Sequence, residues 1–268
     1  MKSLVMGRWR STARLIVFSA AVLAAFGVLS GCAVLRTPQV PMPFISDRID
    51  SALPVSDRAL IVFLPGSQEV PQDLIEQGFV EQVRSRAIAA DIMIADAAPR
   101  HYTGGLFEER LRLDVIEPAI AQGYDEIWLA GISIGGFGTL LYSSLHSDKI
   151  TGAIALAPFV ASDKVLDEVT AAGGLRDWNV TPEPKDWQRN LLTWLKRYGD
   201  ADEQLPKLYV GFGIDDGYDQ MARVFDGVLP EGQFRSAPGD HDWPPWKQLW
   251  GEFLDAAPMP RLNQVSRR

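Results

Sequence analysis

The residues best suited to chemistry in this chain are a serine, a histidine and two neighbouring aspartates. Ser133 is the centre of the pentapeptide 131–135, which reads Gly-Ile-Ser-Ile-Gly and fits the pattern G-x-S-x-G. A serine hydroxyl is a weak nucleophile until a base removes its proton, and the base needs a carboxylate that fixes its tautomer. Together these groups can attack the carbonyl carbon of an acyl compound.

The setting of Ser133 favours this chemistry. A strand-like run over 126–130 precedes the pentapeptide, and the small-residue helix start of 135–138 follows it. A serine between strand and helix in this pattern stands on a nucleophile elbow, a sharp turn that lifts its hydroxyl clear of the sheet edge. Glycines flank it because the turn strains the backbone and a Cβ would strike the neighbouring strand or helix. Ser133 is therefore the candidate nucleophile.

The chain offers three histidines as the base, His101, His146 and His241. His101 precedes the serine, and His146 stands at the end of the helix that follows it. His241 lies on a loop between the strand-like run 233–237 and an amphipathic helix, where an imidazole can reach a nucleophile. We therefore expect His241 to be the general base.

Two adjacent carboxylates, Asp215 and Asp216, follow the strand-like run 207–212. Neighbouring side chains on a turn point in different directions, so only one of them can orient the imidazole. Asp240 and Asp242 flank the histidine, and we expect them to solvate the loop or to cap the following helix. The residues alone leave the choice between Asp215 and Asp216 open.

Strand-like and helix-like segments alternate along the chain, as a mostly parallel sheet requires. Helical faces recur between the strands, for example at Leu113, Ile116 and Ile120. The pattern predicts one α/β domain over 56–258, with a central sheet flanked by helices, and a disordered tail over 259–268. The strand-like runs cover 59–64, 91–95, 126–130, 152–157, 207–212 and 233–237.

The segment between two of these strands, 158–206, is longer than one crossover helix needs. We expect a small helical cap over about 159–205, inserted above the catalytic face, where such caps set substrate choice. Its tryptophans, Trp178, Trp187 and Trp194, either wall an acyl or aromatic pocket or form ordinary core. The expected packing residues of the cap are Val165, Leu166, Val169, Leu191, Leu192 and Leu195.

These motifs together resemble the α/β-hydrolase superfamily over about residues 59–256. In that fold the catalytic residues follow the order serine, acid, histidine, which Ser133, the aspartate pair and His241 obey. The resemblance implies an α/β-hydrolase fold. It favours Asp216 as the acid, because a G-x-x-D pattern is common after the corresponding strand and residues 213–216 match it.

The resemblance also implies an oxyanion hole made of two backbone N–H groups, those of Ser67 and Ile134. Many esterases carry His-Gly after the strand that opens the core, whereas residues 65–67 read Pro-Gly-Ser here. The glycine still permits a tight turn that aims an N–H at a developing oxyanion. Gln68 is the alternative first donor.

The first 31 residues have the features of a secretory signal. Four basic residues and no acidic ones precede an apolar run over 15–29, which is too short for an ordinary membrane span. Residues 29–32, Leu-Ser-Gly-Cys, resemble a bacterial lipobox, in which cleavage before the cysteine accompanies diacylglyceryl transfer to its thiol. We expect a signal peptide over 1–31, lipidation of Cys32 and a proline-rich tether over 32–55.

Acyl chains on Cys32 would anchor the protein to a membrane without a spanning helix. Ala33 after the cysteine resembles an outer-membrane sorting pattern, so we expect a lipid-anchored protein of the bacterial cell envelope that faces the periplasm. The 26 basic and 34 acidic residues give a net charge of −8. Loss of the four basic residues in the signal makes it about −12. This acidic balance argues against nucleic acid as a partner.

The implied activity is that of a serine hydrolase resembling the carboxylesterases, which cleaves an ester through an acyl-enzyme at the cell envelope. A thioesterase or a peptidase would use the same triad. A non-catalytic lipoprotein that kept the fold as a binding module is the alternative from a different class. The sequence holds no metal-ligand cluster and no phosphate loop, so we expect neither a metal nor a cofactor.

Overall fold

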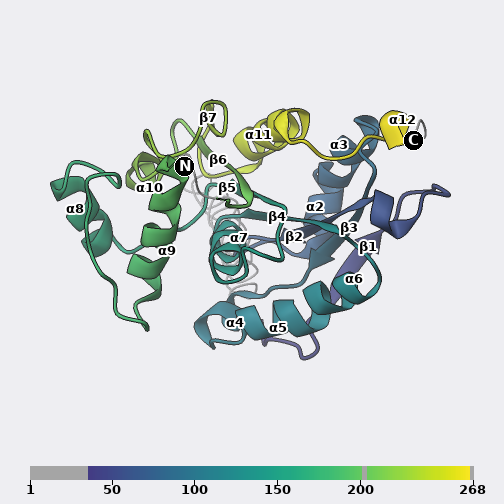
Figure 1. The fold of residues 1–268 in the computed structure, drawn as a ribbon, viewed down its shortest axis with the longest axis horizontal. Helices are drawn as coiled ribbons and strands as arrows, with labels where there is room; N and C mark the ends of the chain where they lie inside the picture. Colours follow the sequence, from purple (N-terminus) through teal and green to yellow (C-terminus); the bar gives the residue numbers. More distant parts are fainter. Residues whose placement is uncertain (1–35, 201–203, 266–268) are drawn as a thin grey trace, which may run out of the picture.

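The computed structural model describes residues 36–200 and 204–265, in which a seven-stranded sheet lies between layers of helices (Figure 1). The strands lie in the order β1-β3-β2-β4-β5-β6-β7. Only β1 runs antiparallel to its neighbour, and all other pairs are parallel. The strands are β1 Phe44–Asp47, β2 Ala59–Leu64, β3 Ala90–Ala95, β4 Glu126–Ile132, β5 Gly152–Leu156, β6 Lys207–Gly213 and β7 Phe234–Ala237.

The central strands form because their sequences are nearly continuous apolar runs. β2, β3 and β5 are buried along their whole length, as is usual for parallel strands covered on both faces. The predicted α/β architecture is confirmed, and the six predicted strands are all present with bounds that differ by no more than two residues. Because β2 to β7 are mutually parallel, their carboxyl ends lie at one edge of the sheet.

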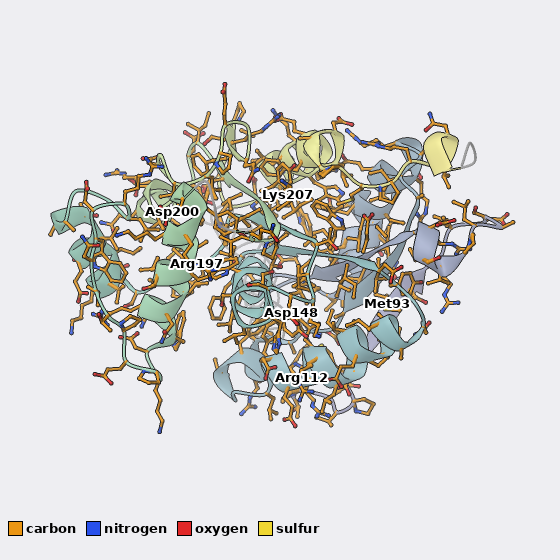
Figure 2. All side chains as sticks on the ribbon, viewed as in Figure 1. Met93, Arg112, Asp148, Arg197, Asp200 and Lys207 are labelled. Carbon is orange, nitrogen blue, oxygen red and sulfur yellow. The ribbon has the colours of Figure 1, made fainter. Side chains whose placement is uncertain are left out.

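Helices cover both faces of the sheet (Figure 1). Phe63 of β2 packs edge-on against Trp250, with ring centroids 5.3 Å apart, whereas Leu60 and Val62 face the opposite layer. Side chains fill the space between the sheet and both layers (Figure 2). One layer contains α2 Pro71–Glu76, α3 Phe79–Ser85 and α11 Trp243–Ala256, and the other contains α4 Pro99–Thr103, α5 Phe107–Leu111, α6 Glu117–Ala121 and α7 Ile134–Leu145.

The helical segment over 107–121 presents a different face from the one predicted. Ile116 is buried, but Leu113 and Ile120 are exposed. The reason is a π-helical turn over Arg112–Ile116 between α5 and α6, which widens the turn beyond 3.6 residues and rotates the later residues. The buried positions therefore repeat every four residues, at Phe107, Leu111, Val115 and Ala119.

The predicted cap follows β5 and consists of α8 Asp163–Ala171, α9 Trp187–Lys196 and the short helix Arg197–Gly199. Arg189 of α9 links the two longer helices of the cap, because its guanidinium pairs with Glu168 of α8. It also pairs with Asp186, directly before α9. The six apolar residues expected to pack the cap are all buried, namely Val165, Leu166, Val169, Leu191, Leu192 and Leu195.

The domain begins earlier than residue 56. β1 pairs with the edge of β3, Met42 is buried, and its N–H donates to the Asp114 carboxylate at 2.7 Å. Part of the predicted tether over 32–55 is therefore sheet and core, because the edge of β3 offers unpaired backbone groups that an extended segment satisfies. The predicted signal peptide over 1–31 and Cys32 lie outside the described residues.

Arg36, at the start of the described chain, reaches two loops at the carboxyl edge of the sheet. Its guanidinium pairs with Asp96, just after β3, and donates to the backbone carbonyl of Glu69, after β2, at 3.2 Å. These contacts hold the start of the domain on the edge that also carries the end of β4.

The chain also stays in contact with the domain beyond residue 258. Met259 is buried, the Ala89 N–H donates to the Pro260 carbonyl at 2.8 Å, and Arg261 forms a β-bridge with Ile88. The predicted disordered tail over 259–268 is wrong for these residues, because they satisfy backbone groups next to β3. Among the described helices, none combines the length and the apolar character that crossing a membrane requires.

Candidate active site

Ser133 stands on a strained turn between β4 and α7. Its backbone has φ +54° and ψ −115°, a conformation that residues with a Cβ rarely adopt. Its N–H donates to the Leu156 carbonyl of β5 at 2.9 Å, and its own carbonyl accepts from Phe137 at 2.9 Å. The strain is therefore held by bonds to the neighbouring strand and helix, as a nucleophile elbow requires.

The flanking glycines allow this turn to form. A Cβ on Gly135 would lie 2.1 Å from the Leu64 carbonyl oxygen at the end of β2, and a Cβ on Gly131 would lie 2.3 Å from the Gly135 carbonyl oxygen. Both distances are shorter than any real contact. The start of α7 can therefore approach the sheet only with glycine at these two positions.

Asp216 and His241 are in direct contact. Oδ2 of Asp216 lies 2.8 Å from Nδ1 of His241, and Oδ1 accepts the N–H of Tyr218 at 3.1 Å. Asp216 is buried with 4% of its surface exposed, whereas Asp215 is exposed to solvent. Of the two predicted acids, it is Asp216 that meets the imidazole.

The loop between β7 and α11 presents His241 at the sheet edge. Its ring lies edge-on to Tyr218 and to Trp246, with centroids 5.1 Å away in both cases. Asp240 accepts the backbone N–H of His241 at 2.7 Å, so its side chain orders the loop. Asp242 stands at the N-cap of α11 without a side-chain cap bond, since prolines early in that helix lack N–H groups.

Ser133, Asp216 and His241 follow β4, β6 and β7, so all three lie at the carboxyl edge of the sheet. The other two histidines have different surroundings. His101 is buried with its ring nitrogens facing the carbonyls of Ala98 and Gln39, and His146 contacts Glu108 at 2.7 Å. These contacts hold loops and helices in position.

The loop after β2 faces the serine. Ser67 lines the same cavity as Ser133 and Ile134, whereas Gln68 is exposed. The geometry thus brings Ser67, rather than Gln68, to the cavity that contains the candidate nucleophile. Ile134 is the first residue of α7, where backbone N–H groups point out of the helix and favour negative charge.

Glu69 is an ionisable residue of this site that the sequence motifs did not indicate. Burial raises the pKa of its carboxyl, and the nearby charge of Asp73 acts in the same direction, while backbone hydrogen bonds and attraction to His241 oppose the rise. Its carboxylate lies against Gly66, where a Cβ would come within 2.2 Å of it. No motif marks it, because its burial depends on how the loop folds over the sheet edge.

A large cavity opens beside Ser133, with a volume of about 1150 Å³. Trp187 and Trp194 of the cap line it, and Trp178 is buried elsewhere in the cap. Trp187 and Trp194 thus border a cavity, while Trp178 and Trp194 belong to the buried core. Within the described residues no group of histidine, cysteine and carboxylate side chains could hold a metal ion.

No protein-family model matches the sequence, and no curated protein sequence matches it either. Solved structures do match. FphF, a fluorophosphonate-binding serine hydrolase of Staphylococcus aureus, is 17% identical with a TM-score of 0.57, over 81% of this chain and 98% of that one. Est1E from Butyrivibrio proteoclasticus is 13% identical with a TM-score of 0.57, over 85% of this chain and 95% of that one.

A ferulic acid esterase is also similar, at 19% identity and a TM-score of 0.52, over 80% of this chain and 97% of that one. The match spans nearly the full length of each of these structures. Together with the sheet order and the elbow, it shows that the chain has the α/β-hydrolase fold. This confirms the fold implied by the sequence motifs. Sequence identities of 19% or less to these structures show a shared fold only, so the reaction has to be inferred from the geometry of the site.

Proposed function

We propose that this chain is a serine hydrolase that cleaves carboxylic esters through an acyl-enzyme. Ser133 is the nucleophile, His241 is the general base, and Asp216 orients the imidazole. The backbone N–H groups of Ser67 and Ile134 receive the oxyanion. The observation that carries the proposal is the 2.8 Å contact between His241 and the buried Asp216, at the sheet edge where Ser133 stands on its strained turn.

The reaction consists of two acyl transfers. His241 takes the hydroxyl proton of Ser133 as the serine oxygen bonds to the ester carbonyl carbon, and the resulting oxyanion is bound by the two N–H groups. His241 then gives this proton to the leaving alcohol as the carbon–oxygen bond breaks. Water attacks the acyl-serine in the same way, and release of the acid restores the serine.

Asp216 contributes through its position. A carboxylate that accepts from Nδ1 selects the tautomer with its proton on that nitrogen, so the lone pair of Nε2 is available to the serine. The same carboxylate stabilises the imidazolium that forms during each transfer. Because Asp216 is buried, this interaction acts in a medium where charges are weakly screened.

The names of similar structures support an ester as the bond that is cleaved. They include a ferulic acid esterase and a monoacylglycerol lipase of Paleococcus ferrophilus, which is 15% identical with a TM-score of 0.50 over 85% of this chain and 99% of that one. Both names describe carboxylic ester substrates.

Labelling with a fluorophosphonate probe tests the proposal. The probe should label the wild type covalently, while Ser133→Ala and His241→Ala should lose labelling. Ser144→Ala is the matched control, since Ser144 lies on the same helix and lines the same cavity. Equal labelling of the wild type and the Ser133 variant would rule out Ser133 as the nucleophile.

Anchoring through Cys32 completes the proposed function. The lipobox-like residues 29–32 support cleavage before Cys32 and lipidation of its thiol, which would hold the hydrolase at the periplasmic face of the outer membrane. In a bacterial host, the wild type should incorporate labelled fatty acid and sediment with outer membranes. Cys32→Ser should do neither, and incorporation of label by that variant would contradict the assignment.

A further inference from the structure

The cavity beside Ser133 extends much further than an ester bond requires. Its floor is one face of α7, from the residue after the nucleophile to the last residue of the helix. At 1.5 Å of rise per residue, this floor is about 16 Å long. The floor residues are Ile134, Phe137, Leu141, Ser144 and Leu145.

One wall of the cavity is α9 of the cap, which follows α7 along its length. At the end near Ser133, the ring of Trp187 lies 4.9 Å from that of Phe137. At the other end, Nε1 of Trp194 donates to the hydroxyl of Ser147, beyond the end of α7, at 3.3 Å. Figure 1 shows the two helices side by side.

The opposite wall is formed by α4 and α5, and it has the same extent. Tyr102 stacks on Phe107 at 4.3 Å and lies 6.1 Å from Phe137. Further along, Glu108 contacts His146, the residue directly after α7. The cavity is therefore a trough between two walls, with Ser133 at one end and Leu145 at the other.

The lining of the trough is apolar through its middle. Aromatic rings surround the end near Ser133, and Leu141, Leu145 and Leu191 continue beyond them. Trp187 and Leu145, at the two ends, have 40% and 58% of their surfaces exposed. Large apolar side chains that border an open cavity mark a surface that an apolar ligand covers.

The carboxylate of Glu108, at the end of the trough near Leu145, is paired with other charged or polar groups. Its Oε1 lies 3.5 Å from the guanidinium of Arg112 and 2.7 Å from the imidazole of His146. Burying an apolar chain beside this group therefore leaves no unpaired carboxylate in contact with it.

We propose that the trough holds the acyl chain of the substrate, and that the substrate is an ester of a linear aliphatic acid of about twelve carbons. The proposal rests on the proposed function, since it places the carbonyl at Ser133. An extended chain advances about 1.3 Å per carbon, so about twelve carbons match the 16 Å floor. A single aromatic acid would fill only the end of the trough near Ser133.

A series of p-nitrophenyl esters, from acetate to hexadecanoate and kept below micelle-forming concentrations, tests the chain length. Each buried methylene contributes up to about fourfold in kcat/KM. We expect a rise of at least about 100-fold from butyrate to dodecanoate and no further gain beyond it. A flat or falling profile, or a preference for feruloyl over dodecanoyl esters, overturns the proposal.

A blocking variant locates the chain in the trough. Leu141→Trp fills the middle of the floor, and the ratio of kcat/KM for dodecanoate to that for butyrate should fall at least tenfold. Leu113→Trp is the matched control, because Leu113 is exposed on the neighbouring helical segment outside the cavity, and it should keep the wild-type ratio. An unchanged ratio in the Leu141 variant contradicts the assignment of the trough.

Binding to Ser133→Ala separates this inference from the proposed reaction. Calorimetry should show dodecanoate binding at least about 100-fold more tightly than butyrate, and Leu141→Trp in the same background should abolish the difference. If the wild type cleaves no ester while dodecanoate still binds in this way, the reaction is wrong and the trough is right. If short esters are cleaved but dodecanoate binds no better than butyrate, the trough is wrong and the reaction stands.

Discussion

Oδ2 of Asp216 lies 2.8 Å from Nδ1 of His241, although 24 residues separate them in the sequence. The contact arises because β6 and β7 are parallel neighbours, so that the loops after them leave the sheet side by side. Backbone bonds continue this pairing past the strands, since the Asp215 N–H donates to the Gly239 carbonyl at 2.9 Å. The two side chains thus meet on a framework that extends from the sheet itself.

The first prediction concerns this pair. Asp216→Asn keeps the size of the side chain but removes the charge that stabilises the imidazolium, so kcat for an ester should fall by about 10³- to 10⁴-fold. Asp215→Asn, the same change on the exposed neighbour, should alter kcat less than about threefold. Steady-state kinetics with one soluble ester measure both, and equal losses in the two variants would contradict the assignment of the acid.

A second prediction concerns the packing of the elbow. Gly135→Ala places a methyl group 2.1 Å from the Leu64 carbonyl oxygen, and the backbone must move to accept it. The free energy of unfolding should fall by about 2–3 kcal/mol, and ester hydrolysis should be lost with the displaced serine. Gly217→Ala is the control, because a Cβ there meets nothing within 4 Å. Urea unfolding of the two variants gives the comparison.

The third prediction follows from Glu69, whose pKa burial raises above 4.5 in the folded protein. A carboxyl with a raised pKa binds its proton more tightly in the folded state, so the protein loses stability as pH rises through the folded pKa. Glu69→Gln removes this loss. The variant should gain stability over the wild type at pH 8, and the difference should shrink as pH falls to 4.5.

Urea unfolding at the two pH values measures this difference. Glu76→Gln, a change at an exposed glutamate of the neighbouring helix, should give similar small effects at both pH values. A gain for Glu69→Gln that is the same at pH 4.5 and pH 8 would exclude ionisation of the carboxyl as its cause.

The fourth prediction compares two tyrosine hydroxyls. Within the part of the chain that the structure describes, the hydroxyl of Tyr102 is buried without a hydrogen-bond partner, and burial strongly raises the pKa of this phenol. Tyr102→Phe should therefore raise the free energy of unfolding by about 1 kcal/mol. The hydroxyl of Tyr124 instead donates to buried Asp91 at 2.6 Å, and Tyr124→Phe should lower it by about 1–3 kcal/mol. Thermal and urea unfolding measure both changes. If the two variants changed the free energy of unfolding in the same direction, this account would be contradicted.

The sequence was most informative where one local pattern determines structure. β2 and β5 are apolar runs bounded by turns, and the glycines around Ser133 define the elbow. It was less informative where distant segments cooperate. β1 is a four-residue strand in a proline-rich segment, and its pairing depends on the free edge of β3. The face of 107–121 depends on a π turn that no residue type marks.

The candidate site divides in the same way. Order along the chain was enough to propose His241 among three histidines. The residues alone left Asp215 and Asp216 open, because both stand on one turn, whereas the resemblance to the α/β-hydrolases favoured Asp216, which is the one that contacts His241. Glu69 was missed since nothing in its neighbourhood resembles a motif. The trough could not be foreseen either, because its floor and its two walls come from three separate parts of the chain.

Arg36 is attached to the loops after β2 and β3. If Cys32 carries a lipid, this attachment limits the distance between the lipid and the site that contains Ser133. Four extended residues reach at most about 14 Å. A hydrolase anchored at this distance could not rotate freely on the membrane. The carboxyl edge of its sheet, which carries Ser133, would stay close to the bilayer, so that apolar esters could enter the cavity directly from the membrane. Inserting twenty glycine and serine residues after position 35 should abolish any preference for membrane-dissolved over micellar esters. An unchanged preference would show that the length of the linker between Cys32 and Arg36 does not affect access to the substrate.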